Sequence, residues 1–388
     1  ACARSDQYDQ ALKLYKQLLK KKKKKEKSLW EYKIAYTYFD RGHYAKASQA
    51  FQDFLDAYPN HERKDKVLWM KAWAHYYQRD FSKARVYWKK LQQELSKNPY
   101  QDSLIYWIGR SFEKEGQSQK AKELYRQVAY SPQYDYYAFL SLKRLSKDFD
   151  IQTLPTSPWI EEIKKTQSHK LPKLIKISQD EHSRLNTLYH LGLIEDFIRA
   201  LQKEKPKEAW ALAYQKSMQE VWESPRVYKK MSEGYPTVYA PWVLLFSYLH
   251  DFPPQVTWSI MRTESFYNPK IVSPADARGL MQIIPPTAHD LAQKLGKESF
   301  NVEDLWNPAI SIELGVYYLS QNLKHFKGNL VYTIASYNAG EESVDRWLKI
   351  RSDLDWDEFV ESIPYTETRN YVKKVLKFYY FYTMLYPV

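Results

Sequence analysis

Glu264 interrupts an otherwise apolar helical pattern. Val256, Ile260 and Glu264 follow one another at intervals of four, so a helix over residues 255–266 would carry all three on one face. Burial at the end of such a stripe disfavours the ionised carboxyl and therefore raises its pKa. An acid of this kind keeps its proton near neutral pH and can donate it to a leaving oxygen. On periodicity alone, an exposed glutamate at a frayed helix end is the favoured interpretation.

Short motifs follow Glu264 in a definite order along the chain. They are Glu264-Ser265, ARGLMQI at residues 277–283, Asn307-Pro308, ASYNAG at residues 335–340, FVESIPY at residues 359–365, and Tyr371-Val372. This series closely resembles the family 1 soluble lytic transglycosylases, whose catalytic domain is lysozyme-like. Single motifs of this kind are weak evidence, but the whole series in register is specific, and the resemblance covers about residues 236–388.

The resemblance implies a role for each matched side chain. Glu264 corresponds to the catalytic glutamate of the family. Tyr337 and Asn338 correspond to residues that bind the sugar beside the scissile bond. Other substrate-binding residues of the groove are matched by Ser273, Gln282 and Glu361, of which Glu361 is a second carboxylate. A purely structural role is the alternative for each of them except Glu264.

Two positions depart from the family pattern. The family often has Met after Gln-Ile, where this chain has Ile284, and usually has Gly where this chain has Asp276. A carboxylate near the groove would favour a cationic sugar, such as a glucosamine that lacks its acetyl group. Asp276 is therefore predicted as a further substrate-binding residue, and the alternative is an ion pair between Asp276 and Arg278.

The activity that the resemblance implies is cleavage of the β-1,4 bond between N-acetylmuramic acid and N-acetylglucosamine in peptidoglycan. Glu264 would protonate the bridging oxygen and then, as a carboxylate, accept a proton from the C6 hydroxyl of the muramyl sugar. Attack by that hydroxyl closes a 1,6-anhydro ring. Most glycosidases use two carboxylates, whereas this reaction requires one. The alternatives are a muramidase-type hydrolase and a non-catalytic peptidoglycan-binding scaffold.

Helix signals surround these motifs. Asn307-Pro308 provides an N-cap and a first-turn proline for a helix that extends to Phe326. Gly340 ends a helix that begins near Leu330. A helix over residues 367–385 carries aromatic side chains on nearly every face and is expected to be buried.

An internal repeat occupies the first 150 residues. Alanines recur at intervals of 36 or 37 residues, at Ala11, Ala47, Ala84 and Ala121, and an aromatic-rich helix–turn–helix pattern surrounds the last three. The pattern resembles tetratricopeptide repeats, whose usual period is about 34 residues. It predicts a mainly α protein, with an α-solenoid over residues 1–150. Further helix pairs, including one helix over residues 183–202, are expected in a scaffold over residues 151–235, followed by a mostly helical catalytic domain over residues 236–388.

Composition and charge narrow the classes of function. The chain of 388 residues has 34 Tyr, 16 Phe and 13 Trp but only 10 Gly, which suits packed helices. Its net charge of +13 favours polyanions. An anionic cell wall fits this charge as well as nucleic acid does, and the sequence lacks a base-reading motif, so no nucleic-acid partner is expected. The basic run Lys20 to Lys25 is interpreted as a solvated helix extension or a flexible segment. No metal or cofactor is expected, because metal-binding and phosphate-loop motifs are missing.

The chain begins with Ala1-Cys2 and contains no other cysteine. A small residue followed by cysteine is what lipoprotein processing leaves at a mature terminus, and acyl chains on Cys2 would anchor the protein to a membrane. No apolar stretch reaches the length of about 18 residues needed to span a bilayer. The predicted location is therefore the periplasm, with attachment to the outer membrane as a lipoprotein. Protein partners are expected on the concave face of the repeats.

Overall fold

The computed structural model describes residues 8–21, 24–94, 101–131, 135–145 and 235–386. The chain divides into two compact units, one of Ala1–Leu154 with Leu348–Asp353 and one of Pro155–Trp347 with Leu354–Val388. Cys2 and nearly all of the predicted scaffold over residues 151–235 lie outside the described residues. The three predicted domain boundaries therefore stay predictions.

The predicted mainly α fold is confirmed. Helices account for the regular structure throughout the described ranges, where extended pairing is limited to two isolated bridges, Val272 with Arg278 and Arg278 with Ile283. Within those same ranges, no helix has both the length and the apolar character required to cross a membrane.

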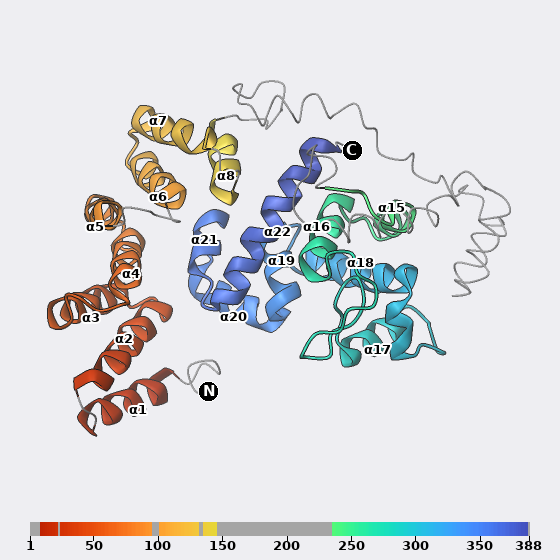
Figure 1. Cartoon of the computed structure of the whole chain (residues 1–388), viewed down its shortest axis with the longest axis horizontal. Coiled ribbons are helices and arrows are strands. Elements are labelled where there is room, and N and C mark those ends of the chain that lie inside the picture. Colours follow the sequence, from red (N-terminus) through yellow and green to blue (C-terminus); the bar gives the residue numbers. More distant parts are fainter. Residues whose placement is uncertain (1–7, 22–23, 95–100, 132–134, 146–234, 387–388) are drawn as a thin grey trace. The chain divides into compact units, whose positions relative to one another are not determined.

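Helix pairs in sequence order build the first unit, drawn from red to yellow in Figure 1. The helices are α1 (Tyr8–Lys21), α2 (Lys24–Asp40), α3 (Tyr44–Ala57), α4 (Lys64–Tyr77), α5 (Phe81–Glu94), α6 (Gln101–Lys114), α7 (Ser118–Ala129) and α8 (Tyr136–Leu145). Each helix packs against the next one along the chain, which is the pattern of a repeat solenoid.

Small residues and tight turns explain the repeat period. Ala47, Ala84 and Ala121 are buried, so the paired helices approach closely at each of them. The turn inside each pair contains one residue in the left-handed region, which is Gly42 in one repeat and Gly116 in another. The intervening repeat has Arg79 there, with φ 61°. A non-glycine residue adopts this conformation only at a cost in conformational energy. Because this turn has no glycine, a search for glycine does not find it.

Aromatic side chains form the core of the repeats. The ring of Trp73 lies edge-on to those of Trp107 (4.5 Å between centroids), Tyr76 (5.2 Å) and Trp88 (5.5 Å), and it stacks on Tyr77 (5.1 Å). Edge-to-face pairs of this kind contribute about 0.5–1.5 kcal/mol each beyond burial. The interpretation of these aromatics as helix-packing residues is therefore confirmed for this unit.

The second unit contains α15 (Ala240–Leu249), α16 (Pro254–Glu264), α17 (Pro285–Lys294), the short 3₁₀ helix η2 (Val302–Trp306), α18 (Pro308–His325), α19 (Leu330–Ala339), most of α20 (Glu341–Arg351), α21 (Trp356–Ser362) and α22 (Thr366–Leu385). Four of these, α16, α18, α19 and α22, are predicted from the sequence. The Asn307 side chain accepts a hydrogen bond from the Ala309 amide (3.0 Å), and Gly340 ends α19 with φ 83°. Both predicted helix signals are confirmed, and α16 ends at Glu264 rather than at Phe266.

Helix α22 packs along α16 and α19 (Figure 1). Buried hydrogen bonds connect this region over long sequence distances. Gln255 Nε2 donates to the Tyr386 carbonyl (2.9 Å), and Trp258 Nε1 donates to the Val238 carbonyl (2.9 Å). The predicted burial of the aromatic helix holds for the faces toward its neighbours, whereas Lys374 on α22 is exposed. The packing of α22 against α16 positions the site described next.

Candidate active site

Glu264 is the last residue of α16 and is partly buried. The apolar stripe below it consists of Val256 and Ile260, both fully buried, which fixes the helix face that carries the carboxyl. The hydroxyl of Tyr371, from α22, donates a hydrogen bond of 2.6 Å to Glu264 Oε1. The carboxyl is therefore held at a junction of two helices rather than at a frayed end.

Burial raises the pKa of Glu264 to about 7, because the surroundings disfavour the ionised form. The hydrogen bond from Tyr371 and the positive charge of Lys374 act in the opposite direction and limit the increase. The predicted raised pKa is thus confirmed. A carboxyl with this pKa is present in both protonation states near neutral pH, as an acid and base in one reaction requires.

The chain turns sharply after Glu264. Phe266 and Tyr267 both adopt left-handed backbone angles, with φ 48° and 66°. The Ser265 hydroxyl lies 2.9 Å from the Leu280 carbonyl oxygen and 3.0 Å from that of Met261. This buried hydroxyl connects the end of α16 to the loop that carries the Gly-Leu-Met-Gln motif.

The glycine of that motif is required by its surroundings. Gly279 has φ 75°, and a Cβ at this position would lie 2.0 Å from the Leu305 carbonyl oxygen. On α18, a Cβ at Gly315 would lie 2.6 Å from the Met281 side chain. The loop is thereby pressed against η2 and α18, so these two glycines have a structural role.

Ser273 and Gln282 organise the same loop. The Ser273 hydroxyl accepts hydrogen bonds from the amides of Ala277 (3.0 Å) and Ala275 (3.2 Å). Gln282 Nε2 donates to the Gly279 carbonyl (3.0 Å) and to the Ile271 carbonyl (3.2 Å). Both side chains thus have structural contacts, and their use in substrate binding stays a prediction.

Asp276 adopts φ 60°, which is the conformational reason that glycine suits this position. Its Oδ1 accepts a hydrogen bond of 2.9 Å from Arg278 Nε, and Arg278 also reaches Glu303 at 3.5 Å. The ion pair between Asp276 and Arg278, which the sequence offered as the alternative, is therefore present.

Tyr337 brings α19 to the same neighbourhood. Its hydroxyl donates to the Met281 carbonyl (2.7 Å), and its ring lies 5.5 Å from that of Tyr318. Burial raises the pKa of Tyr337 well above its usual value, and the charge of Glu264 adds to the increase. Tyr337 therefore lies within electrostatic range of Glu264, and its role in sugar binding stays a prediction.

Asn338 is exposed at the end of α19, and its Oδ1 accepts a hydrogen bond from the Thr368 hydroxyl (2.7 Å). Glu361 is instead buried on α21, where Lys373 of α22 pairs with it at 2.7 Å. The second predicted carboxylate is thus neutralised by a lysine. A role for either residue in substrate binding stays a prediction.

Residues 249–360 match the family model described as the transglycosylase SLT domain, and residues 31–61 and 102–133 match that of the tetratricopeptide repeat. The chain contains an SLT domain. The matched range includes Glu264 and five of the six other predicted site residues. Glu361 lies one residue beyond it.

Similar proteins and solved structures are consistent with the assignment of an SLT domain. The soluble lytic murein transglycosylase of Escherichia coli K12 is 26% identical over 292 residues, which cover 73% of this chain and 44% of that protein. A putative soluble lytic murein transglycosylase of Haemophilus influenzae is 40% identical over 128 residues, covering 33% of this chain and 22% of that protein. The chain thus spans less than half the length of these relatives.

The structure of lytic transglycosylase Slt from Pseudomonas aeruginosa has a TM-score of 0.68 at 22% identity, covering 97% of this chain and 60% of that one. The 70-kDa soluble lytic transglycosylase in complex with bulgecin A has a TM-score of 0.63 at 21% identity, covering 98% and 60%. These similarities confirm the predicted fold, in which helical repeats precede the SLT domain.

Two residues near Glu264 received no role in the sequence analysis. Tyr371 belongs to the last motif, so the motif indicated its position but not that its hydroxyl reaches Glu264. Lys374 follows one helical turn later on α22 and contributes positive charge at the carboxyl. The i, i+3 spacing of a tyrosine and a lysine is the available sequence signal, and it is a weak one.

Proposed function

We propose that this chain is a peptidoglycan lytic transglycosylase, which cleaves the β-1,4 bond between N-acetylmuramic acid and N-acetylglucosamine and forms 1,6-anhydro-N-acetylmuramic acid. The observation that carries the proposal is the single carboxyl of Glu264, with a pKa of about 7 and one oxygen held by Tyr371. The SLT domain and the murein transglycosylases among the relatives support peptidoglycan as the substrate.

The hydrogen bond from Tyr371 assigns the two carboxyl oxygens different tasks. Because Tyr371 donates to Oε1, the proton of the neutral acid is best placed on Oε2, where it can be given to the glycosidic oxygen. Once Glu264 has lost that proton, the Tyr371 hydroxyl and the charge of Lys374 stabilise the carboxylate. The carboxylate then removes the proton from the C6 hydroxyl of the muramyl sugar, which attacks the anomeric carbon.

The ion pair of Glu361 supports formation of the anhydro product rather than hydrolysis. A hydrolase of the two-carboxylate type needs a second free carboxylate, as nucleophile or as base for water. The carboxylate of Glu361 is buried and paired with Lys373, which leaves it poorly suited to either task. With Glu264 as the one acid and base, the internal C6 hydroxyl is the expected nucleophile.

Mass spectrometry of the products from purified sacculi tests this function. The wild-type chain should release muropeptides one water lighter than those of a muramidase, and Glu264→Gln should fold normally but release none. Products with the mass expected of hydrolysis, one water heavier, would show that the chain is a muramidase-type hydrolase instead. A Glu264→Gln variant that still clears peptidoglycan would remove Glu264 from the reaction.

A preference for glycan lacking acetyl groups is a finer proposal that rests on Asp276. The side chain of Asp276 is 53% exposed, so its carboxylate has room for a cationic sugar, but Arg278 already offsets its charge. Rates on acetylated and de-acetylated sacculi, for wild type and Asp276→Gly, measure the preference. The proposal requires a wild-type preference that is reduced in Asp276→Gly, and equal ratios in the two proteins would remove it.

The proposed substrate also sets the proposed location. Peptidoglycan is reached from the periplasm, and acylated Cys2 would attach the chain to the outer membrane. Metabolic labelling with a fatty acid probe, compared between wild type and Cys2→Ser, tests the anchor. The repeats, which match tetratricopeptide repeats, are the surface on which we propose protein partners.

A further inference from the structure

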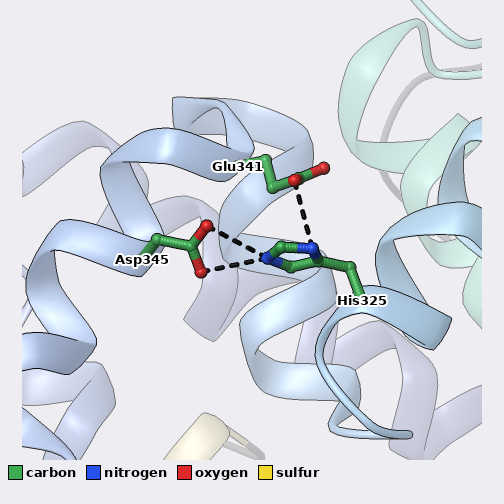
Figure 2. Close-up of side chains that lie close together, drawn as sticks. All are labelled: His325, Glu341 and Asp345. Carbon is green, nitrogen blue, oxygen red and sulfur yellow. Dashed lines mark hydrogen bonds and ion pairs between the residues drawn. The ribbon is translucent and has the colours of Figure 1, made fainter.

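His325, Glu341 and Asp345 lie together on the SLT domain (Figure 2). His325 is the last residue of α18, Glu341 is the first of α20, and Asp345 follows one turn later. The Nδ1 atom of His325 lies 3.1 Å from Glu341 Oε1, and Nε2 lies 3.0 Å from both carboxylate oxygens of Asp345. The ring thus has one carboxylate at each nitrogen.

This arrangement favours a positive charge on or beside the imidazole ring. A neutral imidazole has one N–H and one lone pair. If Nδ1–H donates to Glu341, the lone pair of Nε2 points at the negative oxygens of Asp345 and repels them. Glu341 and Asp345 also repel each other, because like charges four residues apart on a helix are unfavourable. Either a proton or a metal cation between Nε2 and Asp345 relieves both repulsions.

We propose that His325, Glu341 and Asp345 form a binding site for a divalent transition-metal ion such as Zn²⁺. Nε2 of His325 and the carboxylate of Asp345 are the ligands, and Glu341 accepts the Nδ1–H hydrogen bond. Zn²⁺ binds histidine nitrogen and carboxylate oxygen. A carboxylate that accepts the other ring N–H of a ligating histidine fixes its tautomer and strengthens its binding.

The observed distances need only a small adjustment. Ligand atoms on a tetrahedral Zn²⁺ lie about 3.3 Å apart, given metal–ligand distances of about 2.0–2.1 Å. The Nε2–Oδ distances are 3.0 Å, so the ligands need to separate by a few tenths of an ångström. The side chains of His325, Glu341 and Asp345 are 38%, 44% and 42% exposed, which permits the adjustment and admits water as the remaining ligands.

Bound Zn²⁺ would fasten the end of α18 to the start of α20. Glu341 directly follows Gly340, which ends the helix that carries Tyr337 and Asn338. The expected consequences are saturable binding of one ion and a higher unfolding temperature in the presence of Zn²⁺. Both are measured without any reference to transglycosylase activity, so they stand apart from the proposed function.

Isothermal titration of the full chain with ZnCl₂ at pH 7.5 tests the site, with CaCl₂ as a parallel titrant. We expect one Zn²⁺ site of micromolar affinity in the wild type, weakened at least tenfold in His325→Ala and in Asp345→Asn. Binding should also weaken at least tenfold at pH 5.5, because a proton on Nε2 competes with the metal. Ca²⁺, which prefers oxygen ligands, should bind more weakly than Zn²⁺.

His289→Ala is the matched control. His289 is an exposed histidine whose ring meets Phe300 edge-on at 5.3 Å, much as the ring of His325 meets Phe326 at 4.6 Å. Its removal should leave Zn²⁺ binding unchanged. Absence of a stoichiometric Zn²⁺ site in the wild type, or equal affinity in wild type and His325→Ala, would overturn the proposal. Calcium binding that equals zinc binding would do the same.

Discussion

The repeat unit and the SLT domain are both built from helices, but their contacts span different sequence distances. In the repeats, each helix packs on the next, and the aromatic cluster around Trp73 comes from neighbouring helix pairs. In the second unit, which contains the SLT domain, the bond from Tyr371 to Glu264 spans 107 residues and that from Gln255 to Tyr386 spans 131. The lesson is that the candidate site exists only when distant segments have assembled, whereas a repeat needs only its neighbours.

The largest effect is expected from removing a buried tryptophan in each unit. Trp88→Ala and Trp258→Ala both delete a fully buried indole, so each should cost about 3–5 kcal/mol in the unit that contains it. Because Trp258 also bonds the Val238 carbonyl and lies on α16, its loss should disturb Glu264 as well. Calorimetric unfolding together with activity on soluble glycan distinguishes the two variants.

Trp88→Ala is expected to retain most activity on soluble glycan at a temperature below both unfolding transitions, since its contacts lie among the repeats. Trp258→Ala should lose most of it. An equal loss of activity in both variants would contradict the contrast between local and distant contacts.

A pair of glycines sharpens the comparison. Gly116 in the repeats and Gly279 in the SLT domain have nearly the same backbone angle, with φ 78° and 75°. A Cβ at Gly116 meets nothing within 4 Å, so Gly116→Ala should cost only the conformational strain, about 1–2 kcal/mol. At Gly279 the Cβ would lie 2.0 Å from the Leu305 carbonyl, so Gly279→Ala must also displace the loop.

Urea unfolding of the two alanine variants measures this difference. Gly279→Ala should be clearly the less stable protein and should also lose activity, because its loop carries Met281, the acceptor for Tyr337. Equal midpoints for Gly116→Ala and Gly279→Ala would show that the close approach to Leu305 carries no energetic weight.

A smaller effect is expected at the acid itself. The pKa of Glu264 is about 7, so kcat/KM should fall as the pH rises above about 7, where the general acid loses its proton. The hydrogen bond from Tyr371 lowers that pKa. In Tyr371→Phe the alkaline limb should therefore move to higher pH, and the maximal rate should fall about tenfold because the acid is weaker and its carboxylate less stabilised.

The control for this experiment is Tyr332→Phe. Tyr332 packs its ring against Phe359 at 4.7 Å and belongs to α19, so its hydroxyl should not influence Glu264. The pH–rate profile of Tyr332→Phe is expected to match that of wild type. A Tyr371→Phe profile with an unmoved alkaline limb would remove Tyr371 from the control of the proton.

The smallest effect concerns His325 in metal-free buffer. The hydrogen bond to Asp345 raises the pKa of His325, and Glu341 adds to the increase. A raised pKa in the folded state stabilises the fold below the unfolded pKa of about 6.5, and this contribution disappears as the pH rises through the folded pKa. His325→Ala should thus be less stable than wild type at pH 5.5 and equally stable at pH 9, as measured by urea unfolding with a chelator present.

The structural features that depend on residues close together in the chain could be predicted from the sequence. The cap at Asn307, the end of α19 at Gly340 and the buried repeat alanines such as Ala84 follow from local patterns. The raised pKa of Glu264 followed from the apolar stripe only together with the motifs that come after it, since periodicity alone also fits an exposed glutamate. These features require no knowledge of which distant segments meet.

Other features depend on side chains that the fold brings together. No spacing in the sequence indicates that Tyr371 would reach Glu264, or that Lys373 would neutralise Glu361. The groups around His325 come from the ends of two different helices, so they form no recognisable motif. Arg79 was missed for another reason, since a left-handed turn is normally marked by glycine.

The dependence of Glu264 on Tyr371 also affects how the protein matures. The hydroxyl that tunes the acid comes from α22, so a growing or partly folded chain contains the glutamate long before it contains the working acid. The proposed acid catalysis therefore becomes available only when α22 has docked on α16.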